Sequence, residues 1–121
     1  MIEPDIITGS CHCGAVRFEI SRPEWLIACN CSICRRYAAL WAHCPPNVGR
    51  LLAGDGATRA YVWGDGLIAF HFCKTCGVTT HYVGTDGGRV SFNLRLADDP
   101  ALVAGIRVRD FDGADSWAFK N

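Results

Sequence analysis

Cys29-Asn30-Cys31-Ser32-Ile33-Cys34 places three thiols within six residues of one short stretch. Four thiolates close a structural zinc shell, whereas three leave a coordination position open for water or substrate. Two further pairs flank this stretch along the chain, at Cys11-His12-Cys13 and Cys73-Lys74-Thr75-Cys76, and Cys44 is left over. The patterned thiols therefore divide naturally into a group of four and a group of three.

The eight cysteines of this 121-residue chain could instead form disulfides. The start, Met1-Ile2-Glu3-Pro4-Asp5, lacks the basic and apolar segments of a secretory signal peptide, so we expect a cytoplasmic protein with reduced thiols. A redox dithiol is disfavoured because Cys73 and Cys76 do not head a recognisable βαβ unit. The cysteine pattern therefore predicts metal binding.

Charge and hydropathy exclude two classes of partner. Twelve basic residues balance twelve acidic ones, so no basic footprint for nucleic acid is present. No apolar run approaches the roughly 20 residues that a membrane-spanning helix needs. We expect neither nucleic acid nor a membrane as a partner.

Short segments rich in β-branched and aromatic residues indicate strands. Val16, Phe18 and Ile20 alternate with polar residues, which is typical of a half-buried strand. The apolar run 25–28 predicts a strand that delivers the chain to Cys29. Further strands are expected at 50–53, 58–63, 67–72, 78–83 and 89–94.

Turn and capping residues complete the predicted fold. The strongest hairpin signals are Gly54-Asp55-Gly56, Gly64-Asp65-Gly66 and Asp86-Gly87-Gly88. A short helix is expected at 35–40, and another begins at Asp98 or Asp99 and ends at Gly105. The sequence predicts a single-domain, mainly β sandwich or small barrel, in which the four tryptophans belong to the core or an interface.

The pair Cys73 and Cys76, followed by Gly77, is typical of a zinc knuckle, because glycine can adopt the positive φ with which the chain leaves the turn. Cys11 and Cys13 are the better candidates to complete its shell. Spacing alone leaves Cys29 and Cys31 as possible partners.

If Cys11 and Cys13 complete the knuckle, the other three cysteines keep an open position. An open zinc can bind a substrate thiol and lower its pKa, or activate water. The alternative is a fourth protein ligand such as Cys44 or His81, which would give two structural zincs and no chemistry.

Three segments resemble the signature blocks of the glutathione-dependent formaldehyde-activating enzyme family, which is often grouped with centromere protein V. They are Gly9–Val16, Cys29–Arg36 and Phe72–Gly77. The segments 92–96 and 112–115 are similar to the closing part of that family. The resemblance covers nearly the whole chain.

This resemblance implies an Mss4-like, zinc-stabilised β-sheet fold with one or two short helices, formed by residues 1–121 as one domain. It implies a structural zinc and a second, catalytic zinc; their ligands are Cys11, Cys13, Cys73 and Cys76 for the first and Cys29, Cys31 and Cys34 for the second. The family reaction joins glutathione to formaldehyde as the S-hydroxymethyl adduct, which is carbon-sulfur lyase chemistry in the synthetic direction.

Glutathione carries two carboxylates, for which guanidinium groups are natural partners. Arg35, Arg36 and Arg95 are the candidates for substrate binding. Two rival functions remain: a non-enzymatic zinc-stabilised interaction module, and a binder of another small thiol.

Overall fold

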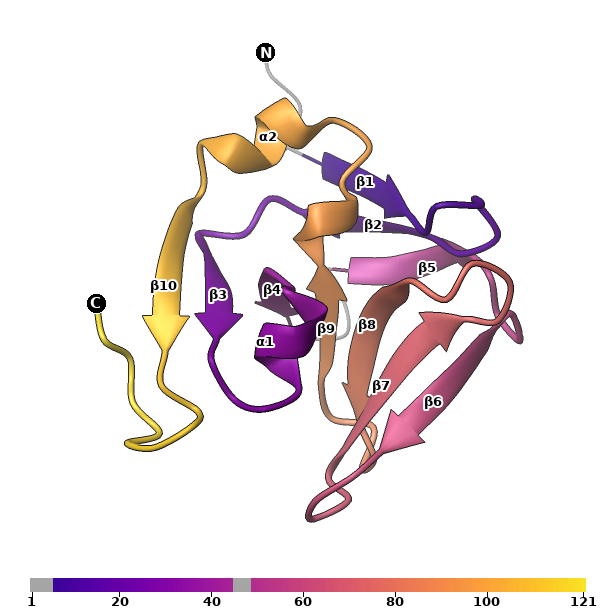
Figure 1. Ribbon diagram of the computed structural model, residues 1–121. Coiled ribbons are helices and arrows are strands. Elements are labelled where there is room, and N and C mark those ends of the chain that lie inside the picture. The colour runs from indigo at the N-terminus through magenta and orange to yellow at the C-terminus, as the bar shows by residue number, and fades with distance from the viewer. Residues whose placement is uncertain (1–5, 45–48) are drawn as a thin grey trace.

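The computed structural model describes residues 6–44 and 49–121, whose strands form two sheets (Figure 1). One sheet has three strands in the order β1-β2-β5, and the other has seven in the order β10-β3-β4-β9-β8-β7-β6. The strands are β1 (Ile6–Ser10), β2 (Arg17–Ser21), β3 (Trp25–Cys29), β4 (Trp41–Cys44), β5 (Gly49–Ala53), β6 (Thr58–Val62), β7 (Ile68–Cys73), β8 (Thr79–Gly84), β9 (Val90–Asn93) and β10 (Arg107–Phe111).

Within residues 6–44 and 49–121 the helices are few and short, as predicted for a mainly β protein. They are α1 (Cys34–Tyr37), the 3-10 turn η1 (Leu94–Leu96) and α2 (Pro100–Ala104). At the start of α2 the Asp99 carboxylate accepts a hydrogen bond from the N–H of Ala101 at 3.0 Å, and Gly105 caps the other end. No helix among the described residues is long and apolar enough to span a membrane.

Two of the predicted hairpins are present, and the third prediction was wrong. The strands flanking 64–66 pair with each other, as do those flanking 86–88. The glycines at 54 and 56 instead carry the chain from one sheet to the other, because β5 pairs with β2 while β6 pairs with β7. Gly54 has φ +105° and packs so closely on Val16 that a Cβ would lie 2.8 Å from the Val16 Cα.

The two sheets share a hydrophobic core. Phe18 of β2 stacks on Phe92 of β9 with ring centroids 4.8 Å apart. A second cluster, built around Trp41, Phe70 and Tyr82, lies on the large sheet and packs against Cys29 and Cys31. The cysteine-rich stretch therefore packs on aromatic side chains of the large sheet.

The end of the chain returns to this stretch. Strand β10 pairs with β3 in parallel, which brings Phe111 level with Cys29. The N–H of Asn30 then donates to the carbonyl of Phe111 at 3.2 Å. Residues 112–119 consequently lie beside the three clustered cysteines (Figure 1).

Candidate metal centres and the adjoining cavity

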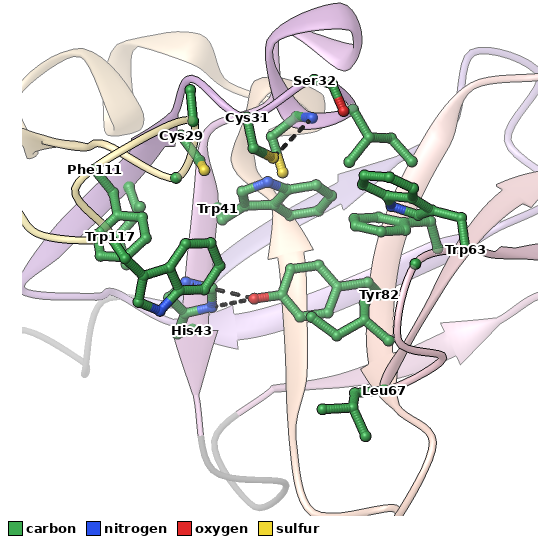
Figure 2. A pocket seen from close by; sticks show the side chains of 18 of the residues that line it. Cys29, Cys31, Ser32, Trp41, His43, Trp63, Leu67, Tyr82, Phe111 and Trp117 are labelled. Carbon is green, nitrogen blue, oxygen red and sulfur yellow. Dashed lines mark hydrogen bonds between the residues drawn. The ribbon is translucent and has the colours of Figure 1, made fainter.

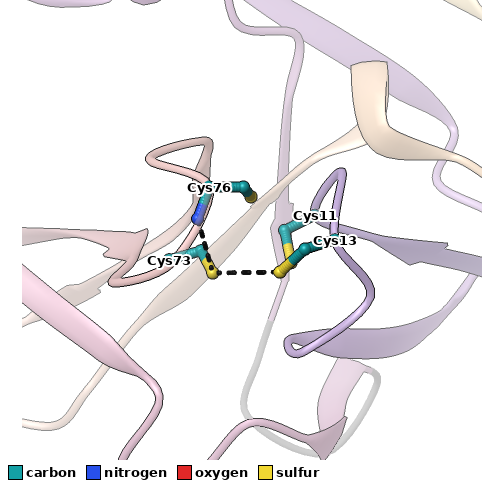
Figure 3. Close-up of side chains that lie close together, drawn as sticks. All are labelled: Cys11, Cys13, Cys73 and Cys76. Atoms are coloured by element: carbon teal, nitrogen blue, oxygen red, sulfur yellow. Dashed lines mark hydrogen bonds between the residues drawn. The ribbon is translucent and has the colours of Figure 1, made fainter.

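Four thiols from two distant parts of the chain meet at one point (Figure 3). The sulfurs of Cys11, Cys13, Cys73 and Cys76 all lie within 4.8 Å of one another. The Cys13 sulfur is 3.6 Å from those of Cys11 and Cys73. A tetrahedral zinc shell with Zn–S bonds of about 2.3 Å needs sulfurs about 3.8 Å apart. The four thiols therefore fit a metal ion such as zinc.

The backbone of each turn points N–H groups at a sulfur. The N–H of Val16 donates to Cys11 Sγ at 3.3 Å, and that of Cys76 donates to Cys73 Sγ at 3.4 Å. Backbone hydrogen bonds, first with Cys13 and then with Val78, lower the pKa of the Cys76 thiol to about 6. Such bonds favour the thiolate, which is the form that binds metal.

The remaining described thiols form a second group at the end of β3. Cys29 ends that strand, Cys31 lies in the turn that follows, and Cys34 is the first residue of α1. The three sulfurs are within 4.8 Å of one another. The N–H of Cys34 donates to Cys31 Sγ at 3.4 Å. The residues Cys29, Cys31 and Cys34 are called the cysteine trio below.

Among the described residues, no histidine, cysteine or carboxylate completes the trio. The alternative with His81 as the fourth ligand was wrong, because Nδ1 of that buried ring is 2.8 Å from the Thr80 hydroxyl and the ring stacks on His71 at 4.7 Å. The side chain of Cys44 lies outside the described part of the chain, so that alternative stays a prediction. The trio fits a metal site with three protein ligands.

Burial and neighbouring groups shift the pKa values of the trio thiols. Burial raises the pKa of the Cys34 thiol, a hydrogen bond with Cys31 raises it further, and the indole N–H of Trp41 acts in the opposite direction. Burial raises the pKa of Cys31 as well, but hydrogen bonds from the backbone and thiol of Cys34 outweigh it, so the net shift is downward.

Trp41 is buried, and its Nε1 makes no hydrogen bond of ordinary geometry among the described residues, although it lies close enough to Cys34 to lower the pKa of that thiol. Figure 2 shows this nitrogen on the edge of the ring that faces Cys31. Buried polar groups are normally paired, so an unpaired donor at this place needs an explanation. It is suited to an anionic sulfur at the trio, whether the thiolate of Cys34 or a sulfur bound beside it.

The C-terminal loop closes over the trio. Asn30 Nδ2 donates to the Asp112 carboxylate at 3.0 Å, and the N–H of Ala114 donates to Asn30 Oδ1 at 2.9 Å. The hydrogen bond from Asn30 and then those from Ser116 lower the pKa of Asp112 to about 2. Two hydrogen bonds, one to a side chain and one from the backbone of the loop, thus attach the loop to Asn30, which lies between the first two trio cysteines.

A cavity of about 730 Å³ adjoins the trio, which forms part of its wall (Figure 2). Aromatic side chains dominate its lining; they include Trp41, Trp63, Phe70, Tyr82, Phe111 and Trp117. Its polar side chains are few, and those of the described lining residues that carry charge are Asp65 and Arg89. The cavity is mainly apolar.

Tyr82 and His43 form the polar part of this wall. The Tyr82 hydroxyl is 2.8 Å from His43 Nδ1, which also contacts the Ser91 hydroxyl. Partial burial of its ring and, second, the positive charge of Arg89 lower the pKa of His43 to about 4. Burial raises the pKa of Tyr82, so its hydroxyl keeps its proton at neutral pH.

Residues 6–101 match the family model described as glutathione-dependent formaldehyde-activating enzyme. The chain belongs to that family. A Halomonas elongata protein that carries the provisional name of glutathione-dependent formaldehyde-activating enzyme is 36% identical over 81 residues. That match covers 59% of this chain and 52% of the relative, so the chain spans about half the length of the curated protein it matches.

A solved structure is similar as well. The crystal structure of a Rhodobacter sphaeroides protein superposes with a TM-score of 0.69 at 27% identity. The superposition covers 84% of this chain and 98% of the other. The fold expected from the resemblance is therefore confirmed for this member of the formaldehyde-activating enzyme family.

The arginines selected from the sequence lie outside the cavity wall of this family member. Arg36 Nη1 donates to the carbonyl of Ser32 at 2.7 Å, and Arg95 Nε donates to that of Ala38 at 2.6 Å. Arg35 is exposed and does not line the cavity. Their role in substrate binding stays a prediction, while Arg89 is the arginine on the wall.

Sequence reasoning missed the aromatic wall. Of the four tryptophans assigned to core or interface, Trp41, Trp63 and Trp117 line the cavity. Their positions are far apart in the sequence, and no local motif groups them. The one available signal was Trp63 beside the Gly64-Asp65-Gly66 turn, because a large exposed aromatic at a hairpin tip often marks a binding surface.

Proposed function

We propose that this protein joins a small thiol to a small aldehyde and that glutathione is the thiol. The observation that carries the proposal is the cysteine trio, which has no fourth ligand among the described residues and opens on a large cavity. Family membership and the provisional name of the Halomonas relative support the same reaction. The reaction is that of a carbon-sulfur lyase working in the synthetic direction.

Two zinc ions are part of the proposal. Cys11, Cys13, Cys73 and Cys76 would hold a structural zinc, around which residues 1–121 fold as one domain. The trio would hold the second zinc. When bound there, this zinc would lower the pKa of a substrate thiol beside it. Three thiolates favour a soft sulfur ligand over water at the open position.

The chain itself then positions charge and protons. The Trp41 N–H faces the trio and can donate to an anionic sulfur there, which satisfies a donor that otherwise has no partner. The sulfur attacks the carbonyl carbon, a C–S bond forms, and the carbonyl π bond breaks. Tyr82 lines the same cavity and keeps its proton, so it can protonate the resulting alkoxide while His43 orients its hydroxyl. The proton that the thiol released to solvent then restores the Tyr82 hydroxyl.

Zinc stoichiometry and turnover test this proposal together. Native mass spectrometry of protein purified without chelator is expected to give two zincs per chain, and one zinc in Cys31→Ser. Nuclear magnetic resonance exchange spectroscopy with glutathione and formaldehyde should show that the adduct forms faster than the uncatalysed rate. Cys31→Ser should reduce the rate to the uncatalysed value. Loss of turnover in such a variant by two orders of magnitude or more is typical when a metal ligand is removed, roughly 3 kcal/mol of activation free energy.

Cys44→Ser is the matched control, because it also replaces one thiol by a hydroxyl. It should retain two zincs and full turnover. A Cys44→Ser protein with one zinc would mean that Cys44 closes the trio as a structural site. A protein with two zincs and no excess turnover would instead support the non-enzymatic module.

A further inference from the structure

We propose that the aldehyde accepted by this site is an aryl aldehyde carrying an acidic group. The inference rests on the proposed function, in which the glutathione sulfur lies at the trio. It concerns the part of the cavity that extends away from the sulfurs.

The cavity is much larger than formaldehyde. At about 730 Å³ it lies in the range of roughly 300–1,000 Å³ that encloses drug-sized ligands. Formaldehyde has two heavy atoms and would leave nearly all of that space to water. Indole and phenyl rings offer water few hydrogen bonds, so filling the cavity with water is unfavourable compared with filling it with a larger apolar reactant.

The walls of the cavity carry exposed aromatic side chains. Trp63 and Trp117 lie on opposite sides of the cavity, and both are exposed apolar residues, Trp117 at 71%. Covering such surface releases about 25 cal/mol per Å². A planar ring between these walls could make the offset or edge-on contacts that aromatic side chains prefer.

Trp117 is also held in an unusual backbone conformation. Its φ is +58°, a region that L-residues with large side chains rarely adopt. Its N–H donates to the carbonyl of Asp112 at 2.7 Å, and its ring packs edge-on against Phe111 at 5.1 Å. Backbone strain of this kind concentrates at binding sites, and here it directs an indole ring to the mouth of the cavity.

Glutathione does not match the charge of this wall. It carries two carboxylates and one ammonium group, whereas Arg89 is the one lysine or arginine among the described lining residues. A carboxylate left without a partner in an apolar cavity is costly to bury. If the glutathione sulfur reaches the trio, most of its body stays near the solvent, and the apolar volume is left to the aldehyde.

Arg89 explains the acidic group. No carboxylate among the described residues forms an ion pair with the Arg89 guanidinium. Arg89 nevertheless lines the cavity and is close enough to lower the pKa of His43. Guanidinium binds carboxylates in a bidentate manner and also packs on aromatic faces. An aromatic acid with the aldehyde at its other end would therefore place the carboxylate at Arg89 and the carbonyl toward the trio.

The chemistry is the same addition. The glutathione sulfur bonds to the aryl carbonyl carbon, the carbonyl π bond breaks, and its oxygen takes up one proton. The product is a hemithioacetal, and no oxidant or reductant is needed.

The test compares three aldehydes with glutathione on the zinc-loaded full chain: formaldehyde, benzaldehyde and 4-carboxybenzaldehyde. Stopped-flow absorbance follows loss of the aryl carbonyl, and exchange spectroscopy follows formaldehyde. The ratio of kcat/KM to the uncatalysed rate constant should be about tenfold or more greater for 4-carboxybenzaldehyde than for formaldehyde, since one buried ring contributes roughly that factor. Dividing by the uncatalysed rate removes the higher intrinsic reactivity of formaldehyde. Arg89→Gln should lower the ratio of 4-carboxybenzaldehyde to benzaldehyde by about tenfold.

Trp63→Ala should lower the ratio of aryl aldehyde to formaldehyde by about tenfold. Tyr61→Ala is its control, because Tyr61 is an exposed aromatic on the adjacent strand β6 and does not line the cavity. This control should leave every ratio unchanged. Equal ratios in Trp63→Ala and the parent protein would overturn the assignment of the wall.

A binding measurement separates this inference from the proposed function. Calorimetry with 4-(hydroxymethyl)benzoate, which cannot undergo the addition, should show binding that Trp63→Ala weakens about tenfold. Turnover of formaldehyde without aryl turnover or probe binding would overturn the inference and leave the function standing. Probe binding without turnover of any aldehyde would overturn the proposed function and the aldehyde with it, and would leave only a site for an aromatic acid. Faster reaction of formaldehyde with thiophenol than with glutathione would assign the apolar volume to the thiol and overturn the inference.

Discussion

Gly113 lies so close to Cys29 that a Cβ at position 113 would be 2.6 Å from the Cys29 sulfur. The same atom would be 3.2 Å from the Cys31 Cβ. Real Cβ atoms do not approach to 2.6 Å, so any side chain here would displace the sulfur or the loop. The C-terminal loop thus limits where the first trio sulfur can lie, although it contributes no thiol of its own.

Gly113→Ala should therefore weaken metal binding at the trio and leave the four-thiol group loaded. We expect roughly 10- to 100-fold lower zinc affinity at the trio, as is usual when the surroundings of a metal ligand are disturbed. Zinc titration with a chromophoric chelator measures the effect. Gly105→Ala is the matched control, because its Cβ would meet nothing nearer than an Arg22 nitrogen at 3.8 Å. Unchanged trio affinity in Gly113→Ala would contradict the prediction.

The two thiol groups should differ in their effect on folding. Cys73 is fully buried and joins strand β7 to the first turn through a sulfur contact with Cys13. Cys73→Ser should unfold the domain, because binding of structural zinc is itself folding free energy. Cys31→Ser should fold, since the trio lies on a loop supported by the Trp41 cluster. Circular dichroism distinguishes the two, and a natively folded Cys73→Ser protein without zinc loss would reverse the assignment of roles.

Local features of this fold could be predicted from the sequence. The alternation around Phe18, the turn at Cys73 and the cap at Asp99 each depend on residues within one short segment, and all three are present. The strand before Cys29 was predicted for the same reason. Strand β1 was missed because its pattern, Ile-Ile-Thr-Gly-Ser, does not alternate.

The site itself depends on contacts that no local pattern reveals. The parallel pairing of β10 with β3 brings Gly113 to Cys29, and nothing near either residue indicates it. Arg36 follows the trio directly in sequence, yet its side chain binds the carbonyl of Ser32, whereas Arg89 reaches the cavity from a hairpin. Proximity in sequence was a poor guide to proximity in the cavity.

His81 should make the folded state sensitive to acid. Burial of the ring, and then the nearby His71, lower the pKa of His81 to about 4, against about 6.5 in the unfolded chain. Its contribution to stability is therefore complete above pH 6.5 and is lost as pH falls toward 4. The loss amounts to about 3 kcal/mol over this window.

The comparison of the parent protein with His81→Asn isolates this effect, because acid also releases zinc from both proteins. Asn keeps a polar group near the Thr80 hydroxyl but does not titrate. Urea unfolding at pH 7, 6 and 5 with excess zinc should show a smaller fall in the free energy of unfolding for His81→Asn. Parallel falls in the two proteins would show that His81 does not control the acid response.

Trp41→Phe should lower turnover while leaving the free energy of unfolding nearly unchanged. The substitution keeps an aromatic ring against Phe70 and Tyr82 and removes the indole N–H, which is buried without a partner among the described residues. Removing an unpaired buried donor relieves a desolvation cost of roughly 1–3 kcal/mol, which offsets the loss of ring area. Urea unfolding should therefore show a change of no more than about 1 kcal/mol. Turnover with glutathione should fall by about 100-fold, because the substrate sulfur loses a donor that stabilises its negative charge. A variant that unfolds more easily but retains full turnover would make Trp41 a packing residue and remove it from the mechanism.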